Sequence, residues 1–384
     1  MGVAYCFWAV MVGTTLPTPL YGIYQHRLGF SNLVLTALFA VYAVGVLAAL
    51  LVWGPVSDQI GRRAALAPGL VASALTGIVF LLARSLGPLF IGRILSGVSA
   101  GVFTGTGTAA LLDLAGEEAR GRATLVATAV NVGGLGTGPL LAGTLAQLTS
   151  SPLRLPYWVQ LGLLVPGVVA VLLMPETVTD RTALRLRIQP LRIPDEARSV
   201  FSQASLAGFA GFAVFGLFTA VASSFLAHTL HESSHVLAGA VVFAVFAAAA
   251  VGQLALGQVS ERPALLAGCL ALAAGMVLVA LSLLVKSLPV LIVGGITAGV
   301  GQGLSFRAGL AAINARVPAQ MRGEVGSSYF VVCYVAISIP VVGVGVLADL
   351  ANLRTAGVVF SAVVVAIALI ACGLLARGEA GSAR

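Results

Sequence analysis

Long runs of apolar residues, separated by short polar gaps, make up most of the chain. A helix needs about 20 mostly apolar residues to cross a bilayer, and about twelve such runs follow one another. In the first half of the chain the runs lie at 3–25, 32–53, 64–83, 86–111, 122–149 and 155–174. In the second half they lie at 200–227, 234–257, 264–285, 288–312, 323–348 and 355–376. The pattern predicts an all-α membrane protein with twelve transmembrane helices.

One longer polar stretch divides these runs six and six. The segment from Pro175 to Ser199 holds five arginines, four acidic residues and three prolines. We therefore predict a six-helix bundle at 1–174, a cytoplasmic connector at 175–199 and a second six-helix bundle at 200–384. Pseudo-symmetry between the bundles is expected, because 53–58 aligns with 256–261 at a shift of 203 and 120–121 aligns with 322–323 at a shift of 202. Repeated halves are a common transporter plan.

Composition excludes a soluble domain. Hydrophobic residues make up 59% of the chain and charged residues 9%, with a mean hydropathy of +1.04, whereas a soluble domain carries about 25% charged residues. The net charge of +8 does not predict nucleic-acid binding, because the basic residues form no tract. The four cysteines lie singly inside apolar runs, which predicts packing roles and neither a disulfide nor a metal site.

The basic residues also predict an orientation. Most of the 21 fall in cytoplasmic segments if both termini are cytoplasmic, as the positive-inside rule requires. Lys286 is the single lysine, a bias typical of GC-rich bacterial genomes, so we expect a bacterial inner membrane. The first run begins almost at Met1 with no basic residues before it, which argues against a cleaved signal peptide.

A motif rich in glycine and charge lies at Gly54–Arg63, where we predict the short cytoplasmic loop between the second and third helices. Its glycines would permit a tight turn. The carboxylate of Asp58 would accept hydrogen bonds at a helix N-terminus, and Arg62 and Arg63 would bridge to a partner helix or to lipid headgroups. The alternative is a loop that only follows the positive-inside rule.

Two arginines fall inside predicted spans. A cation at the bilayer centre costs about 2.5–3.5 kcal/mol on insertion scales, so a functional or structural role is expected for it. We expect Arg93 to face a central cavity; the alternative is a structural arginine bonded to carbonyl groups. Arg307 follows Gln302 in the tenth span, and no carboxylate lies in the middle of a span. We therefore hypothesise an anionic or zwitterionic substrate. The cavity candidates are Tyr21, Tyr24, Arg93, Asn131, Gln302, Arg307 and Tyr329.

Prolines interrupt two spans. Pro17 and Pro19 interrupt the first span. The backbone carbonyl groups that they leave without a hydrogen bond would line a cavity; the alternative is a kink that only shapes the packing of the helix. The fifth span has a small-residue pattern that would serve as a hinge or an ion seal, or as ordinary close packing. This pattern comprises Gly134, Gly138, Pro139 and Gly143.

Three motifs resemble the major facilitator superfamily. Gly54–Arg63 is similar to its loop signature Gly-x-Leu-x-Asp-Arg-x-Gly-Arg-Lys, with Val56, Gln59 and Arg63 as departures. The segment from Arg93 to Gly97 is similar to Arg-x-x-Gln-Gly, with Ser96 in place of glutamine. The segment 134–143 is similar to the exporter signature Gly-x-x-x-Gly-Pro-x-x-Gly-Gly, with Ala142 as a departure.

The resemblance implies alternating access by two rocking halves. It implies a gating role, latching the outward-open state, for Gly54, Asp58, Gly61, Arg62 and Arg63, and it implies efflux of a drug or metabolite. We expect a monomer in the lipid bilayer with a small-molecule substrate and no cofactor, metal or nucleic acid. A proton is a candidate coupling ion, although the carboxylates lie only at span ends or in loops.

Other functions are weighed against this prediction. Uptake of a small anionic or zwitterionic metabolite is the alternative within the transporter class. A membrane-embedded enzyme would need clustered acidic residues for a metal, and a receptor-like protein would favour a large soluble domain. No nucleotide-binding loop occurs, so the prediction is a secondary transporter and not an enzyme.

Overall fold

The computed structural model describes residues 1–178, 189–254, 260–318 and 321–382 of the chain. These residues form helices and no strand, which confirms the prediction of an all-α fold. They group into two compact units, which are described separately. Unit 1 comprises 1–30, 38–189 and 234–243, and unit 2 comprises 31–37, 190–233 and 244–384. The predicted bundle boundaries stay a prediction, and residues 179–188 of the connector lie outside the described residues.

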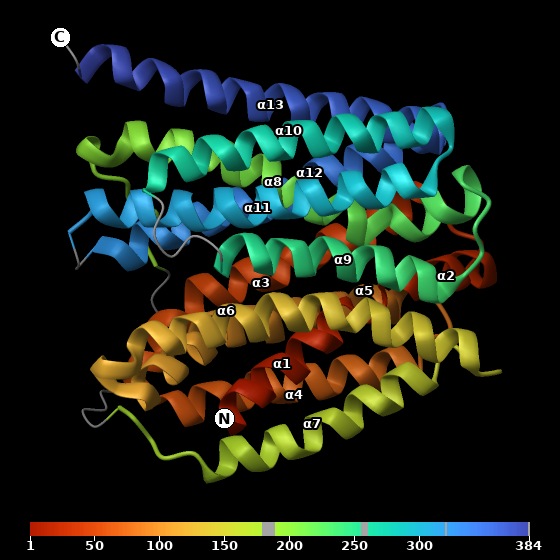
Figure 1. Ribbon diagram of the computed structural model, residues 1–384. Helices are drawn as coiled ribbons and strands as arrows, with labels where there is room; N and C mark the ends of the chain where they lie inside the picture. Colours follow the sequence, from red (N-terminus) through yellow and green to blue (C-terminus); the bar gives the residue numbers. More distant parts are fainter. Residues whose placement is uncertain (179–188, 255–259, 319–320, 383–384) are drawn as a thin grey trace. The chain divides into compact units, whose positions relative to one another are not determined.

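Unit 1 contains the first seven α-helices (Figure 1). Their bounds are α1 Gly2–Thr15, α2 Tyr21–Leu28, α3 Asn32–Ile60, α4 Arg62–Leu81, α5 Leu86–Val102, α6 Thr108–Leu148 and α7 Leu155–Leu173. The first turns of α9 also belong to this unit. As predicted, prolines interrupt the first span, where a short 3-10 turn, Thr18–Leu20, separates α1 from α2.

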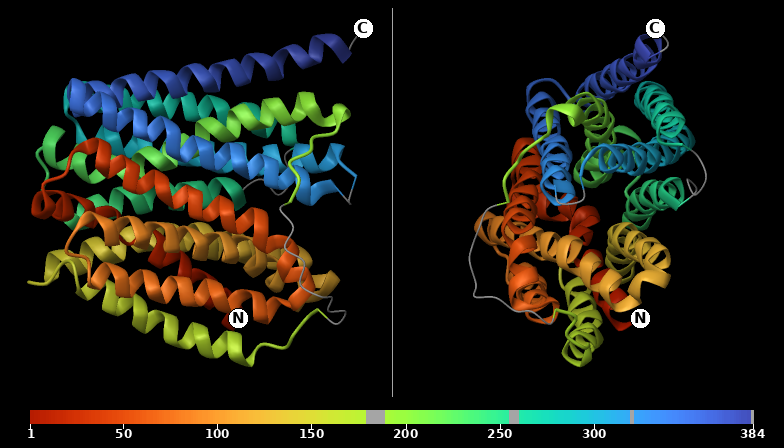
Figure 2. Two further views of the ribbon diagram at one scale, coloured as in Figure 1. Left: turned by 180° about the vertical axis from the view of Figure 1, so that it is seen from behind. Right: turned by 90° about the vertical axis from the view of Figure 1, so that its left-hand side faces the viewer.

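Unit 2 contains the remaining helices together with the first turns of α3. Their bounds are α8 Arg198–Ser224, α9 His235–Leu254, α10 Glu261–Val285, α11 Leu288–Arg316, α12 Arg322–Leu350 and α13 Leu353–Ser382. Two views from other directions show α10 beside α11 and α13 (Figure 2), and these are closely packed pairs. A Cβ atom added to Gly275 of α10 would meet the backbone nitrogen of Ala298 at 2.4 Å. Small residues thus let these helix backbones touch.

Eleven helical stretches of the described chain are long and apolar enough to cross a membrane. One of them, Leu86–Leu148, has 63 residues, which corresponds to about 95 Å against a hydrocarbon core of about 30 Å. It combines the predicted fourth and fifth spans through a π-helical stretch, Phe103–Gly107, and a non-helical residue, Gly116, at φ 71° and ψ 175°. The break at Gly116 falls between the two predicted spans, so the stretch supplies two crossings.

The motif at 54–63 corrects one sequence-based expectation. We predicted a loop, but α3 continues to Ile60 and α4 begins at Arg62, so Gly61 alone separates the two helices. Most of the motif is therefore helical, and the turn depends on one glycine at φ 101°. The matching repeat segment at 256–259 lies outside the described residues.

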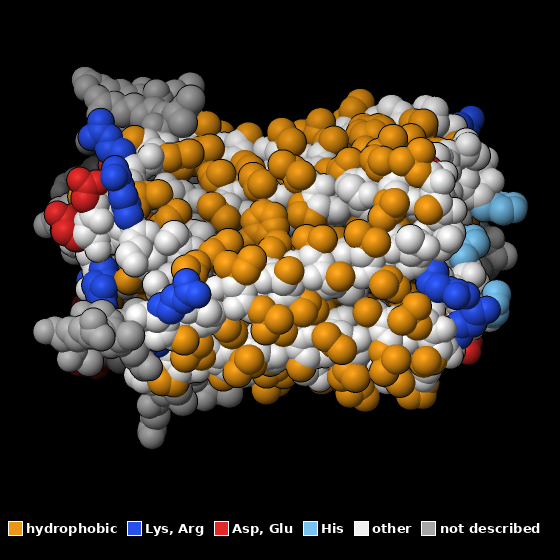
Figure 3. All heavy atoms as spheres, turned by 90° about the horizontal axis from the view of Figure 1, so that it is seen from above, with side chains coloured by type: hydrophobic (Ala, Val, Ile, Leu, Met, Phe, Trp, Pro, Cys, Tyr) orange, Lys and Arg blue, Asp and Glu red, His pale blue; other side chains and the backbone are white. Residues whose placement is uncertain are grey.

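The outward surface of unit 2 is apolar along the middle of its helices. Figure 3 shows hydrophobic side chains across the centre of one face and charged or histidine side chains toward the helix ends. Exposed residues of α10 and α13 include Leu270, Val277, Val363 and Ile370. Cys6, Cys269 and Cys333 are buried, Cys372 is half-buried and all four are free thiols, as predicted.

Candidate functional site

A charged cluster forms where α3 ends and α4 begins, inside unit 1. The guanidinium of Arg62 donates hydrogen bonds to the Ser57 hydroxyl at 2.8 Å and to Asp58, and its Nε donates to Asp113 Oδ2 of α6 at 2.9 Å. The Arg62 side chain is only 14% exposed, whereas that of Asp58 is 65% exposed. One largely buried cation therefore joins two carboxylates from different helices, an arrangement that stabilises it better than an isolated surface pair would.

Glu176, which follows α7, supplies a second anchor for the same turn. Its carboxylate accepts hydrogen bonds from the backbone N–H groups of Arg62 at 2.7 Å and Arg63 at 3.3 Å. These two N–H groups begin α4 and have no partner within the helix, so the carboxylate caps it and interacts favourably with its dipole. A Cβ atom on Gly61 would lie 2.3 Å from Glu176 Oε2. Only glycine satisfies both the positive φ and this close approach.

A similar cap occurs inside unit 2, at the start of α3. Asp349 of α12 accepts hydrogen bonds from the backbone N–H of Asn32 at 3.1 Å and of Leu33 at 3.0 Å, and from Asn32 Nδ2 at 3.0 Å. The hydroxyl of Ser31 accepts a longer bond from Val34 N at 3.4 Å. The first turn of α3 therefore depends largely on a carboxylate that comes from a helix more than three hundred positions later in the chain.

Arg93 of α5 is the buried cation of unit 1. Its side chain is 2% exposed, and it donates a hydrogen bond to the Thr14 carbonyl oxygen at 2.7 Å. The guanidinium carbon lies 4.5 Å from the ring centre of Tyr42 and 5.3 Å from that of Phe39, within the range of cation–π attraction. Its Nε has no hydrogen-bond partner among the described residues. Within the described residues the charge is thus stabilised by a carbonyl group and two rings, without a carboxylate.

The tyrosines of the predicted cavity set are buried in unit 1. Tyr21 is 2% exposed and its hydroxyl has no hydrogen-bond partner among the described residues. Tyr24 donates a hydrogen bond to the Tyr157 hydroxyl at 3.2 Å, and Tyr157 stacks on Phe80 with the ring centres 5.1 Å apart. Asn131 lies half-buried in α6. The structure therefore places polar groups in this unit that are shielded from solvent.

Unit 2 holds the remaining predicted cavity residues on two helices. Arg307 of α11 donates a hydrogen bond to the Gln253 carbonyl oxygen of α9. One turn earlier in α11, Gln302 is 1% exposed and its Oε1 has no partner among the described residues. Tyr329 of α12 is fully buried and stacks on Phe306 with the ring centres 5.8 Å apart. Here too a carbonyl group bonds the cation.

The small residues of α6 make close backbone contacts inside unit 1. A Cβ atom on Gly134 would lie 2.5 Å from Met11 Cβ, and one on Gly138 would lie 2.3 Å from the Val12 carbonyl oxygen of α1. A Cβ atom on Gly143 would lie 2.2 Å from the carbonyl oxygen of His235, at the start of α9. Pro139 lies inside the helix. Three of the four predicted hinge or seal residues therefore touch another helix backbone directly.

Sequence reasoning named the pieces of these clusters without pairing them. Asp113 and Asp349 carry no sequence signal beyond their places at the ends of predicted spans, and Glu176 none beyond its place in the polar connector. Their hydrogen bonds join positions 51 to 317 residues apart, and no local pattern records such a pairing. The hydrogen bond from Arg93 to the Thr14 carbonyl oxygen could not be predicted from the sequence, in which only the prolines after Thr14 indicate carbonyl groups without a helical partner.

These features define a multi-pass helical membrane protein with buried cations and carboxylate-capped helix ends. The sequence model of the Major Facilitator Superfamily matches residues 3–341. The chain belongs to this family of transporters. A search of curated protein sequences gave no match.

Solved structures of transporters share the fold. The human organic anion transporter MFSD10 (TETRAN) is 20% identical, with coverage of 97% of this chain and 98% of that chain and a TM-score of 0.69. A POT family transporter in complex with 5-aminolevulinic acid is 13% identical, with coverage of 96% and 94% and a TM-score of 0.78. A bacterial homologue of the human lysosomal transporter Spinster is 14% identical, with coverage of 98% and 96% and a TM-score of 0.70.

Proposed function

We propose that the chain is a monomeric secondary transporter that exports an anionic or zwitterionic small molecule across a bacterial inner membrane by alternating access. The observation that carries this proposal is the buried guanidinium of Arg93, which has no carboxylate partner in the described part of the chain. An unpaired buried charge is costly, and a substrate carboxylate or phosphate would satisfy the Nε–H that the protein leaves unbonded.

The distribution of acidic residues supports an anionic group in the substrate. None of the aspartates and glutamates whose burial the structure describes is buried, whereas Arg93 is. Two structures that share the fold belong to an organic anion transporter and to a transporter in complex with 5-aminolevulinic acid, which carries both a carboxylate and an amine. These likenesses agree with the proposed substrate class.

Export is supported by the small-residue pattern of α6, which resembles the exporter signature of the family. The direct backbone contacts of Gly134, Gly138 and Gly143 suit a seal, because a close helix contact leaves no room for water. In alternating access each end of the pathway closes in turn. The cluster of Gly54, Asp58, Gly61, Arg62 and Arg63 is the proposed gate at the predicted cytoplasmic end, and the Asp349 cap at the start of α3 is the proposed latch at the other.

A ligand screen on the purified protein tests the substrate class first. A ligand that binds the folded state raises the melting temperature. Organic anions, zwitterions and cations are compared on the native protein and on the Arg93→Gln and Arg93→Lys variants. We expect stabilisation by an anion or zwitterion that is lost in R93Q and partly kept in R93K. Stabilisation by cations alone, or anion binding unchanged in R93Q, would contradict the proposal.

Flux in membrane vesicles then tests direction and coupling. With the ligand identified by the screen, an exporter accumulates it in everted vesicles. Accumulation only in right-side-out vesicles would replace export by the uptake alternative. Collapse of the proton gradient by a protonophore should abolish uphill flux if the proton is the coupling ion, whereas a flux that persists would exclude that role.

A further inference from the structure

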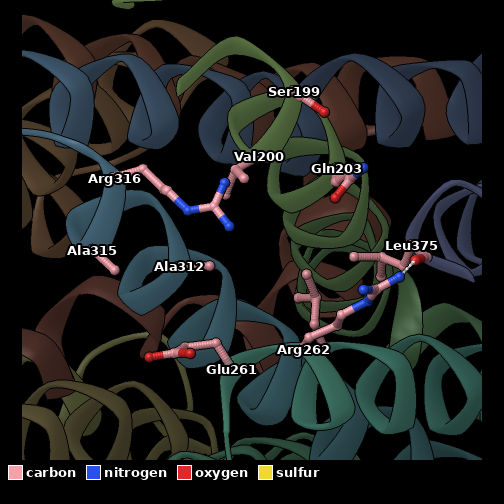
Figure 4. A pocket seen from close by; sticks show the side chains of 10 residues that line it. Ser199, Val200, Gln203, Glu261, Arg262, Ala312, Ala315, Arg316 and Leu375 are labelled. Atoms are coloured by element: carbon pink, nitrogen blue, oxygen red, sulfur yellow. Dashed lines mark hydrogen bonds between the residues drawn. The ribbon is translucent and has the colours of Figure 1, made fainter. Parts of the chain in front are cut away.

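A polar pocket lies at one end of unit 2, where α8 and α10 begin and α11 ends. It has a volume of about 250 Å³. Figure 4 shows the side chains of Ser199 and Gln203 from α8 on one side, Arg316 from α11 on another and Arg262 from α10 below. Apart from Glu261, the rest of its wall is small or apolar and includes Leu265 and Ala312. Four helices of a single unit therefore enclose this pocket.

The two arginines of the pocket are held differently. Arg262 is half-buried and donates a hydrogen bond to the Leu375 carbonyl oxygen of α13, which fixes the direction of its side chain (Figure 4). Arg316 is exposed, its guanidinium points into the pocket, and it forms no ion pair with any described residue. Glu261, the single acidic residue of the lining, forms no such pair either and points away from the Arg262 guanidinium. With two arginines and one glutamate, the lining of the pocket carries a net positive charge.

Two further groups suit an anion. The N-terminal ends of α8 and α10 lie at this end of the unit, and helix N-termini carry partial positive charge. The Ser199 hydroxyl and the Gln203 amide are donors that can complete the coordination of a phosphate oxygen. Arginine is the side chain best matched to a phosphate, because its planar group can donate two parallel hydrogen bonds.

We propose that this pocket binds a phosphate group, held chiefly by Arg316 and Arg262, and that the group belongs to the headgroup of an anionic phospholipid. The predicted topology places this end at the cytoplasmic surface, where basic pockets between membrane helices recognise such headgroups. The adjoining helices, α10 and α13, carry exposed apolar side chains such as Leu270 and Leu374, against which acyl chains can lie. A soluble phosphate compound shares the same chemistry and is distinguished by the test.

The test counts bound lipid by native mass spectrometry of the delipidated, detergent-purified full chain. Phosphatidylglycerol, phosphatidylcholine and inorganic phosphate are titrated separately into the native protein. We expect phosphatidylglycerol to bind with at least tenfold preference over phosphatidylcholine. In Arg316→Gln its affinity should fall about fivefold to tenfold, since each basic residue near an anionic lipid contributes on the order of one kcal/mol.

Two matched variants sharpen the result. In Glu261→Gln the affinity should rise by about the same factor, because the one opposing charge is removed. Arg377→Gln removes the same charge from α13, two positions beyond Leu375 and so on another side of the helix, and should leave the affinity unchanged. The melting temperature without lipid confirms that each variant is folded.

Each outcome decides the proposal. A rise in E261Q together with a fall in R316Q supports the pocket. Phosphatidylglycerol binding without an effect of inorganic phosphate identifies the lipid as the source, whereas competition by millimolar phosphate identifies a soluble phosphate site. Equal binding of both lipids, or R316Q and R377Q behaving alike, would overturn the assignment.

Discussion

The cap that Asp349 places on α3 can be tested without knowing the substrate. The N–H groups of Asn32 and Leu33 have no acceptor inside α3, because the first N–H groups of a helix never do. The Asp349 carboxylate accepts a hydrogen bond from each, at 3.1 and 3.0 Å. Replacing it by alanine removes these two bonds, the side-chain bond to Asn32 and a negative charge at the helix N-terminus.

The size of the effect follows from this geometry. A lost cap costs about 0.5–2 kcal/mol, and the charge at an exposed helix N-terminus contributes about 0.3–1 kcal/mol. Asp349 is exposed, so screening by water and salt favours the lower part of these ranges. A total of about 1–2 kcal/mol raises the opening constant of the first turn of α3 by a factor of about 5–30.

Hydrogen exchange of the backbone measures this opening. In Asp349→Ala the peptide covering 31–38 should take up about two more deuterons at the shortest times, from Asn32 and Leu33. Asp349→Asn keeps one carbonyl acceptor and should show a smaller change. Glu176→Ala is the matched control, because it should expose the N–H groups of Arg62 and Arg63 and leave 31–38 unchanged. The reasoning fails if D349A leaves exchange at Asn32 and Leu33 as it was, or if E176A raises it equally.

Three further substitutions follow from close contacts and buried charge. Gly138→Ala places a Cβ atom 2.3 Å from the Val12 carbonyl oxygen and should destabilise the protein by about 1–3 kcal/mol. The control is Gly133→Ala, whose Cβ atom meets nothing within 4 Å and should not destabilise the protein. The melting temperatures of the two variants in detergent check this prediction. Gly61→Ala combines a φ of 101° with a clash against Glu176, so its melting temperature should fall clearly below that of Gly87→Ala, and equal values would contradict the role of the turn. Arg62→Gln should free Asp113 and raise proteolysis near the break at Gly116, and an unchanged cleavage pattern would show that this cluster does not hold α6.

The spans were readable from the sequence because each needs only a long apolar run, and every predicted run contains a helix or part of one. The boundaries around charged motifs were not. At 54–60 glycine, proline and polar residues predicted a loop, but α3 continues to Ile60. Two hydrogen bonds hold this end of α3: the Trp53 indole donates to the Ala65 carbonyl oxygen at 2.9 Å, and the Gln59 amide donates to the Pro55 carbonyl oxygen at 3.1 Å. The first contact joins α3 to α4 and the second lies within the last turn of α3, and together they outweigh the local turn preference.

The candidate site shows the same limit. Residue type marked Arg93, Arg307 and Gln302 as unusual inside apolar spans, and the structure finds Arg93 and Gln302 buried and Arg307 bonded to a carbonyl group. What each one contacts depended on packing that sequence spacing does not contain. Tyr42 carries no motif, yet its ring lies closer to the Arg93 guanidinium than that of any other described aromatic residue.

The two carboxylate caps are alike in chemistry and different in connection. Glu176 caps α4 within the first half of the chain, beside a glycine that no other residue can replace at that φ. Asp349 caps α3 inside unit 2 and joins a helix of the first predicted bundle to one of the second, beside Ser31, whose hydroxyl accepts a hydrogen bond from the same turn. Alternating access, as proposed, moves the halves of the chain and leaves each half largely intact. The proposal therefore predicts that the Glu176 cap persists through the cycle and that the Asp349 cap breaks once in every cycle. A bond that breaks repeatedly should be exposed and of modest strength, and its helix should keep a second cap when the first is lost, as the Ser31 hydroxyl provides for α3.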